Sequence, residues 1–195
     1  MPLKESKLFF VLAFLMAAIV ALSNYLVQFP VNYFGLESLL TYAAFSYPMA
    51  FLITDLSNRR YGKKYAKKIV YLGFLIGVLL TLYFSTNFSN LISIRIAIGS
   101  GTAFIIAQLI DVKIFDKLRK KKWFVAPLTS SLVGSAIDTF LFFSISFYGT
   151  ETNWISLSFG DLFVKVLVSL SMLVPFRLLI SSIKEAPTIN KKFSA

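Results

Sequence analysis

The sequence predicts an all-α integral membrane protein, a six-transmembrane-helix bundle that forms a single domain over residues 1–195. The chain is 57% hydrophobic and 15% charged, with a mean hydropathy of +0.74, which is too apolar for a soluble domain. Its apolar runs are long enough to cross a hydrocarbon core of about 30 Å, which takes about 20 helical residues. Basic residues gather in short blocks between these runs, as in loops held on one side of a membrane.

The six predicted spans cover residues 8–29, 39–56, 69–84, 94–115, 123–148 and 162–183. The first could be a secretory signal, because Ala21-Leu22-Ser23 loosely resembles a cleavage site. The apolar run continues past this point and further spans follow, which favours a retained helix. Ala13, Ala17 and Ala21 form a stripe of small residues on this helix, which we interpret as a packing surface for another helix.

The second span is interrupted by Pro48, which removes a backbone donor and predicts a kink beside Phe45 and Tyr47. The third span is the most purely apolar and should be scaffold. In the fourth, Gly99-Ser100-Gly101 lacks the strand and the Lys-Ser/Thr of a phosphate loop, so close helix packing explains it better.

The formal charge of +11 reports on topology rather than on nucleic-acid binding. Dense basic blocks at residues 59–68 and 113–122 follow the second and fourth spans, whereas residues 30–37, 85–93 and 149–160 contain no Lys or Arg. Positive charge holds short loops on the cytoplasmic side. We therefore expect a multi-pass protein with both termini in the cytoplasm.

Cysteine and histidine are both absent. This excludes disulfides, thiolate chemistry, imidazole proton relays and the commonest transition-metal ligands. We expect a protein that is not an enzyme and that has no cofactor or metal. An intramembrane aspartyl hydrolase is the enzyme alternative, because Asp55 and Asp111 lie at similar depth, but neither has the glycine-flanked context of those enzymes.

Asp138 lies near the middle of the fifth span. A carboxylate at the bilayer centre costs about 2.5–3.5 kcal/mol, so such residues normally face a protein interior or a wet cavity. Helical spacing places Ser131, Gly134, Ser135 and Thr139 on its face. The pattern predicts a polar cavity inside the membrane, in which Lys165 or Arg95 forms an ion pair with Asp138.

Counting about 1.5 Å per residue from each helix end sorts the polar groups by depth. The outer layer contains Asn24, Gln28, Arg95 and Lys165; the middle layer contains Ser46, Gln108, Ser135 and Asp138; the inner layer contains Thr54, Asp55, Asp111 and Lys113. We expect these groups to share one cavity. Asp55 and Asp111 each precede a basic block, so with Thr54 they either gate the cavity or pair with the adjacent Lys and Arg residues.

Several stretches together resemble the bacterial queuosine-precursor transporter family over nearly the whole chain. They are residues 23–28, 44–48 and 54–56, then 95–97 and 108–112, then Trp123 with Ala126-Pro127, Asp138-Thr139 and residues 165–167. The resemblance implies a six-helix inner-membrane importer of 7-deazaguanine precursors of the tRNA nucleoside queuosine, 7-cyano-7-deazaguanine or its 7-aminomethyl analogue. It also implies similarity to the membrane subunits of energy-coupling-factor transporters, whose docking surface the alanine stripe resembles. A binding subunit with a separate ATPase is therefore the alternative.

A deazaguanine presents two adjacent donors that match the oxygens of one carboxylate, for which Asp138 is the candidate. Gln108 and Asn24 could contact its O6 side, and Phe45 or Tyr47 could stack on the ring. The predicted substrate-binding residues are Asn24, Gln28, Phe45, Tyr47, Arg95, Gln108, Ser135, Asp138 and Lys165. We expect alternating access between outward and inward cavities, with a small-molecule substrate and the lipid bilayer as partners; a homodimer is left open.

Overall fold

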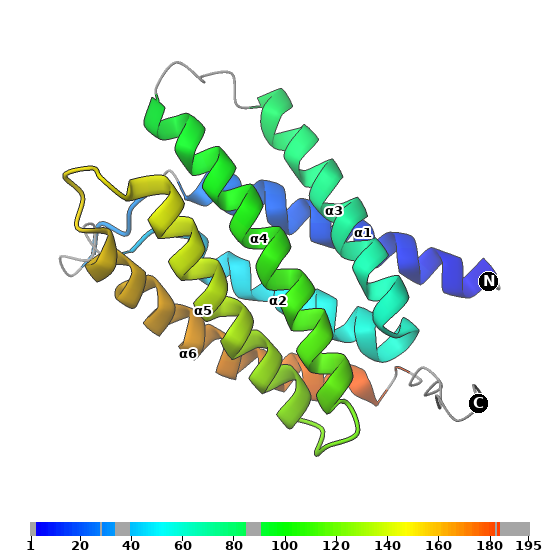
Figure 1. The fold of residues 1–195 in the computed structure, drawn as a ribbon. Coiled ribbons are helices and arrows are strands. Elements are labelled where there is room, and N and C mark those ends of the chain that lie inside the picture. Colours follow the sequence, from blue (N-terminus) through cyan, green and yellow to red (C-terminus); the bar gives the residue numbers. More distant parts are fainter. Residues whose placement is uncertain (1–2, 28, 34–39, 85–90, 182, 184–195) are drawn as a thin grey trace, which may run out of the picture.

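The computed structural model describes residues 3–27, 29–33, 40–84, 91–181 and 183. This part of the chain forms six α-helices and no β-strand, which confirms the predicted all-α fold (Figure 1). The helices are α1 (Leu3–Leu26), α2 (Ala43–Tyr61), α3 (Lys63–Phe84), α4 (Leu91–Leu118), α5 (Val125–Phe147) and α6 (Trp154–Ile180).

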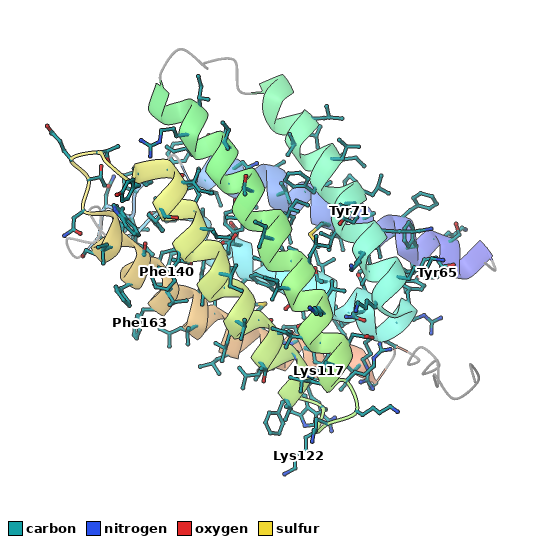
Figure 2. The ribbon with its side chains drawn as sticks, viewed as in Figure 1. Tyr65, Tyr71, Lys117, Lys122, Phe140 and Phe163 are labelled. Atoms are coloured by element: carbon teal, nitrogen blue, oxygen red, sulfur yellow. The ribbon has the colours of Figure 1, made fainter. Side chains whose placement is uncertain are left out.

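Four of the described helices contain segments long and apolar enough to cross a membrane. These segments are Ser6–Leu26, Ile94–Leu118, Val125–Phe147 and Trp154–Ile180. Their outward side chains are apolar: Phe140 on α5 and Phe163 on α6 project away from the bundle (Figure 2). A soluble monomer rarely exposes apolar surface on this scale.

The basic segment 59–68 is helical, whereas the sequence suggested a loop. Helix α2 continues to Tyr61 and α3 begins at Lys63, so only Gly62 joins them. Gly62 has φ 78° and its N–H donates to the carbonyl oxygen of Asn58 at 2.8 Å. Glycine adopts this left-handed conformation without steric cost, while Lys and Arg are good helix formers.

Helix α2 is the centre of the bundle and contacts all five other helices (Figure 1). It buries several polar side chains, among them Ser46, Thr54, Asp55, Ser57 and Asn58. A helix largely surrounded by protein can be this polar because its neighbours supply hydrogen-bond partners. The central helix therefore carries polar groups into the interior.

The alanine stripe of α1 packs within the chain. Ala13 and Ala17 are buried, and a Cβ atom built on Gly77 of α3 would lie 2.7 Å from Val20 and 3.2 Å from the carbonyl oxygen of Ala17. This confirms that the stripe is a packing surface. The suggestion that it serves as a docking surface for another subunit stays a prediction, although α3 packs on Ala13 and Ala17.

Residues 59–68 and 113–122 lie at the same end of the bundle, which we call the basic end. Arg119, the residue that follows α4, donates a hydrogen bond to the carbonyl oxygen of Asn58 in α2. Figure 2 shows Lys117 and Lys122 projecting from this end, around the turn between α4 and α5. The two basic blocks, residues 59–68 and 113–122, therefore lie on one side of the bundle, as the positive-inside rule predicts.

Candidate functional site

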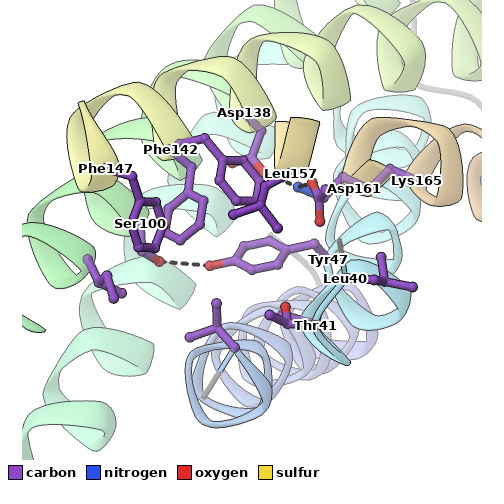
Figure 3. A pocket seen from close by; sticks show the side chains of 14 residues that line it. Leu40, Thr41, Tyr47, Ser100, Asp138, Phe142, Phe147, Leu157, Asp161 and Lys165 are labelled. Carbon is purple, nitrogen blue, oxygen red and sulfur yellow. Dashed lines mark hydrogen bonds and ion pairs between the residues drawn. The ribbon is translucent and has the colours of Figure 1, made fainter. Parts of the chain in front are cut away.

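A cavity of about 170 Å³ lies in the half of the bundle farther from the basic end (Figure 3). Its wall comes from α2, α4, α5 and α6, together with residues that follow α1 and precede α2. The lining residues are Val27, Leu40, Thr41, Ala43, Tyr47, Ile96, Ser100, Asp138, Phe142, Phe143, Phe147, Leu157, Asp161 and Lys165. Mostly apolar walls with a few converging polar groups are typical of small-molecule sites.

One buried lysine binds two acids at the edge of this cavity. Lys165 Nζ lies 2.9 Å from Asp138 Oδ2 and 2.7 Å from Asp161 Oδ2. The predicted pairing of Asp138 with Lys165 is therefore present in the structure, and the cavity adjoins it. Because burial makes unpaired charge costly, these contacts explain how Asp138 is accommodated, although its side chain is only about 5% exposed.

Helical spacing assembles this cluster. Asp161 and Lys165 are one turn apart on α6, while Asp138 and Thr139 are adjacent on α5. Thr139 Oγ1 accepts from Lys165 Nζ at 3.1 Å and donates to Asp161 Oδ2 at 2.8 Å. These contacts use only the Oδ2 atom of each acid. Oδ1 of Asp138 and of Asp161 has no hydrogen-bond partner among the described residues and can accept from a ligand.

Tyr47 links the charged cluster to α1 and α4. Its ring centroid lies 5.2 Å from Lys165 Nζ, a cation–π distance. Its hydroxyl lies 2.8 Å from Ser100 Oγ and donates to Asn24 Oδ1 at 3.2 Å, which also accepts from Ser100 Oγ at 2.9 Å. The Lys165 ammonium over the ring and the hydrogen bonds of the hydroxyl thus hold Tyr47 in place against the cavity.

Another part of the cavity wall is mainly aromatic. Phe142, Phe143 and Phe147 of α5 and Leu157 of α6 line it, and Figure 3 shows Phe142 and Phe147 on the same side as Ser100. Aromatic faces offer a flat ring large apolar contact and a stacking surface. The cavity therefore combines donors and acceptors at one edge with aromatic surface at another.

Several residues predicted for the site lie elsewhere. Phe45 is 46% exposed and does not line the cavity. Arg95 donates to the carbonyl oxygens of Ile145, at 3.1 Å, and Tyr148, at 2.7 Å, so it caps the end of α5 rather than pairing with Asp138. Gln28 lies outside the described residues.

The deeper predicted residues are buried but do not line this cavity. Gln108 Oε1 accepts from Thr54 Oγ1 at 2.5 Å, and Ser135 Oγ has no partner among the described side chains and backbone. Asp55 accepts from Ser130 and Ser131. These groups form a second buried polar region, nearer the basic end, instead of one continuous cavity.

Sequence reasoning missed Asp161, Ser100 and the aromatic wall. Asp161 precedes the predicted sixth span by one residue, although α6 already begins at Trp154. Its spacing of four residues from Lys165 was the available signal, because such pairs lie on one helix face. Ser100 was interpreted only as part of a packing motif.

Comparison with known proteins identifies the family. Residues 41–180 match the family model described as "Putative vitamin uptake transporter". The chain is 33% identical to the "Queuosine precursor transporter" of Escherichia coli, over 80% of this chain and 79% of that protein. It is 34% identical to the "Probable queuosine precursor transporter" of Haemophilus influenzae, over 84% and 82% of the two chains.

A relative in Bacillus subtilis, a "Probable queuosine precursor transporter", is 31% identical over 72% of this chain and 70% of that protein. No solved structure matches the chain. The family and the apolar helices together indicate a multi-pass membrane transporter and not an enzyme, which removes the aspartyl hydrolase alternative. The chain belongs to the vitamin uptake transporter family, together with these queuosine precursor transporters.

Proposed function

We propose that this protein imports a queuosine precursor, 7-cyano-7-deazaguanine or 7-aminomethyl-7-deazaguanine, across the bacterial inner membrane by alternating access. The observation that carries the proposal is the Asp138–Lys165–Asp161 cluster at the edge of an aromatic-walled cavity. The names of the relatives support the cargo class.

The chemistry of a deazaguanine fits the available groups. Its N1–H and exocyclic amine are adjacent donors, and a carboxylate offers two acceptor oxygens at hydrogen-bond distances of about 2.7–2.9 Å. Oδ1 of Asp138 and of Asp161 can accept these donors, since their described contacts use Oδ2. Lys165 holds the two carboxylates in place with its three N–H donors, and Tyr47 and Phe142 supply ring surface.

The proposed topology has six membrane-spanning helices with both termini in the cytoplasm. Helices α2 and α3 complete the count because their junction carries one basic block and the α4–α5 turn carries the other. The cavity then lies toward the periplasmic side. The alternative is a binding subunit that requires a separate ATPase; part of its suggested docking surface is already occupied, since α3 packs on Ala13 and Ala17.

Binding by the purified chain tests this function. We expect 7-cyano-7-deazaguanine to bind Asp138→Asn at least about tenfold more weakly than the unaltered protein, because each lost charge-assisted hydrogen bond is worth about 1.5–3 kcal/mol. Glu151→Gln, an exposed acid in the α5–α6 turn, is the matched control. Equal binding of guanine would contradict the proposed cargo, and co-purification of a stable complex with an ATPase would favour the alternative.

A further inference from the structure

The second buried polar region contains two aspartates that the transport cavity does not use. Asp55 of α2 is 1% exposed and Asp111 of α4 is 0% exposed. Each oxygen of Asp55 accepts from one hydroxyl of α5: Oδ1 from Ser130 at 3.1 Å and Oδ2 from Ser131 at 3.4 Å. Both oxygens of Asp55 therefore have a hydroxyl donor within the bundle.

Asp111 is different, because it is fully buried and neither of its oxygens has a hydrogen-bond partner among the described residues. It lies at the level of Asp55, because Thr54 of α2 donates to Gln108 of α4 on one side of the two acids and Asn58 donates to the carbonyl oxygen of Val112 on the other. Asn58, one turn beyond Asp55 on α2, donates to the carbonyl oxygen of Val112, and its own Oδ1 atom is also buried without a described partner. Buried polar atoms of this kind need a ligand, since each unmet group costs about 1–3 kcal/mol.

No Lys or Arg forms an ion pair with Asp55 or Asp111 in the part of the chain that the structure describes. Arg119 contacts Asp116 and the carbonyl oxygen of Asn58, and Arg177 lies over the Trp123 ring at 5.0 Å. The charged and polar groups nearest the pair in sequence are Arg59 and Asn58 on α2, Gln108 and Lys113 on α4, and Ser130 and Ser131 on α5. Around them α3 contributes Ile69 and Val70, packed with Val112, and α6 contributes Phe176 and Ile180, packed with Leu56, so these two helices add no charge here.

Two neighbouring carboxylates in such surroundings repel one another and cannot both remain ionised without a compensating cation. A shared proton satisfies the arrangement: one of the two acids carries it and donates to the other, while the hydroxyls of Ser130 and Ser131 donate to Asp55.

Helix α5 connects this pair with the transport cavity. Ser131 contacts Asp55, Ser135 lies one turn further, and Asp138 one turn beyond that. Ser135 Oγ is buried without a described partner between the two regions. Movement of α5 that accompanies cavity opening would therefore also change the contacts of Asp55.

We propose that Asp55 and Asp111 form a proton-binding site whose protonation is coupled to import. The proposal rests on the proposed function. A proton from water in the outward-open cavity passes the Ser135 hydroxyl, which lies between the two regions, and binds a carboxylate oxygen of the aspartate pair. It leaves that oxygen for cytoplasmic water when the basic end opens, and both aspartates then lie exposed to that water.

Measurements on proteoliposomes that contain the full chain test the proposed function and the proton coupling separately. Counterflow of labelled 7-cyano-7-deazaguanine without any gradient reports on transport itself, so its absence overturns the proposed function. With counterflow present, an inward proton gradient of about one pH unit should drive about tenfold accumulation for one proton per substrate. Counterflow without gradient-driven accumulation overturns only the proton coupling, and accumulation driven by a Na⁺ gradient in its place overturns the assignment of the ion.

Variants then assign the site. In Asp111→Asn and in Asp55→Asn, we expect substrate-dependent proton flux, read by a pH dye inside the vesicles, to fall to the protein-free background while counterflow persists at a lower rate. Asp116→Asn, an acid at the basic end that contacts Arg119, is the matched control and should keep the flux. Because either variant could fail to fold, only monodisperse protein is compared, and Asp111→Glu should restore flux. Normal flux in either folded variant would overturn the assignment.

Discussion

Lys165 Nζ lies 2.7 Å from Asp161 Oδ2 on the same helix, and this contact fixes the ammonium group between α6 and the Asp138 carboxylate of α5. One cation thus meets two acids. When all three groups are charged, the cluster keeps a net charge of −1, which favours a ligand that presents donors.

Removing Lys165 should destabilise the fold. Lys165→Met leaves Asp138 and Asp161 buried without their cation, and breaking a buried ion pair costs about 3–5 kcal/mol. Unfolding in detergent, followed by circular dichroism, measures the loss. Adding Asp138→Asn to Lys165→Met should recover part of it, and Lys122→Met, an exposed residue at the basic end, is the control. Full stability of the single variant would show that the cluster is not held together by charge.

The ring and the hydroxyl of Tyr47 should contribute separately. Tyr47→Phe removes the contacts with Ser100 and Asn24, so we expect a loss of about 0.5–1.5 kcal/mol in stability and little change in ligand affinity. Tyr47→Ala removes the ring and should weaken binding much more. Calorimetric titration with 7-cyano-7-deazaguanine separates the two, and equal loss in both variants would assign the role to the hydroxyl.

Arg95 should be a helix cap rather than a ligand of the substrate. Arg95→Gln loses the contacts to the end of α5, and we expect it to lower stability by about 0.3–2 kcal/mol. The substrate dissociation constant of the folded variant should stay within a factor of about two, which the same titration measures. A large affinity loss would return Arg95 to the binding site.

Close packing of α1 on α3 should tolerate no extra volume at Gly77. Gly77→Val places a side chain against Val20, and overpacking of this kind costs about 1–3 kcal/mol. The yield of monodisperse protein and its unfolding temperature should both fall. Gly101→Ala is the matched control, because a Cβ atom there meets Phe74 at an ordinary 3.4 Å.

Sequence patterns predicted the helices and the Asp138–Lys165 pair, because exposing polar groups to hydrocarbon and burying an unpaired charge both carry a large free-energy cost. Apolar length determines where helices can cross, and the cost of burying Asp138 demands a partner at similar depth. Depth alone does not give the direction in which a side chain points around its helix. Arg95 and Phe45 were therefore predicted to bind the substrate, although neither lines the cavity.

The boundaries of helices were the other source of error. Asp161 belongs to the first turns of α6, before the predicted span, so it was excluded from the membrane region. Residues 59–61 belong to α2 and residues 63–68 to α3, because Gly62 alone supplies the turn between these helices. Composition marks where polar groups begin but not where a helix ends, since Lys and Arg continue a helix readily.

The most direct test of the account is uptake by cells that lack both the synthesis and the import of queuosine precursors. Queuosine in their tRNA, measured after supplying 7-cyano-7-deazaguanine, reports on transport. We expect the unaltered chain and Glu151→Gln to restore it, and Asp138→Asn, at equal membrane abundance, to fail. Restoration by Asp138→Asn to the unaltered level would contradict the central claim that this buried carboxylate binds the cargo.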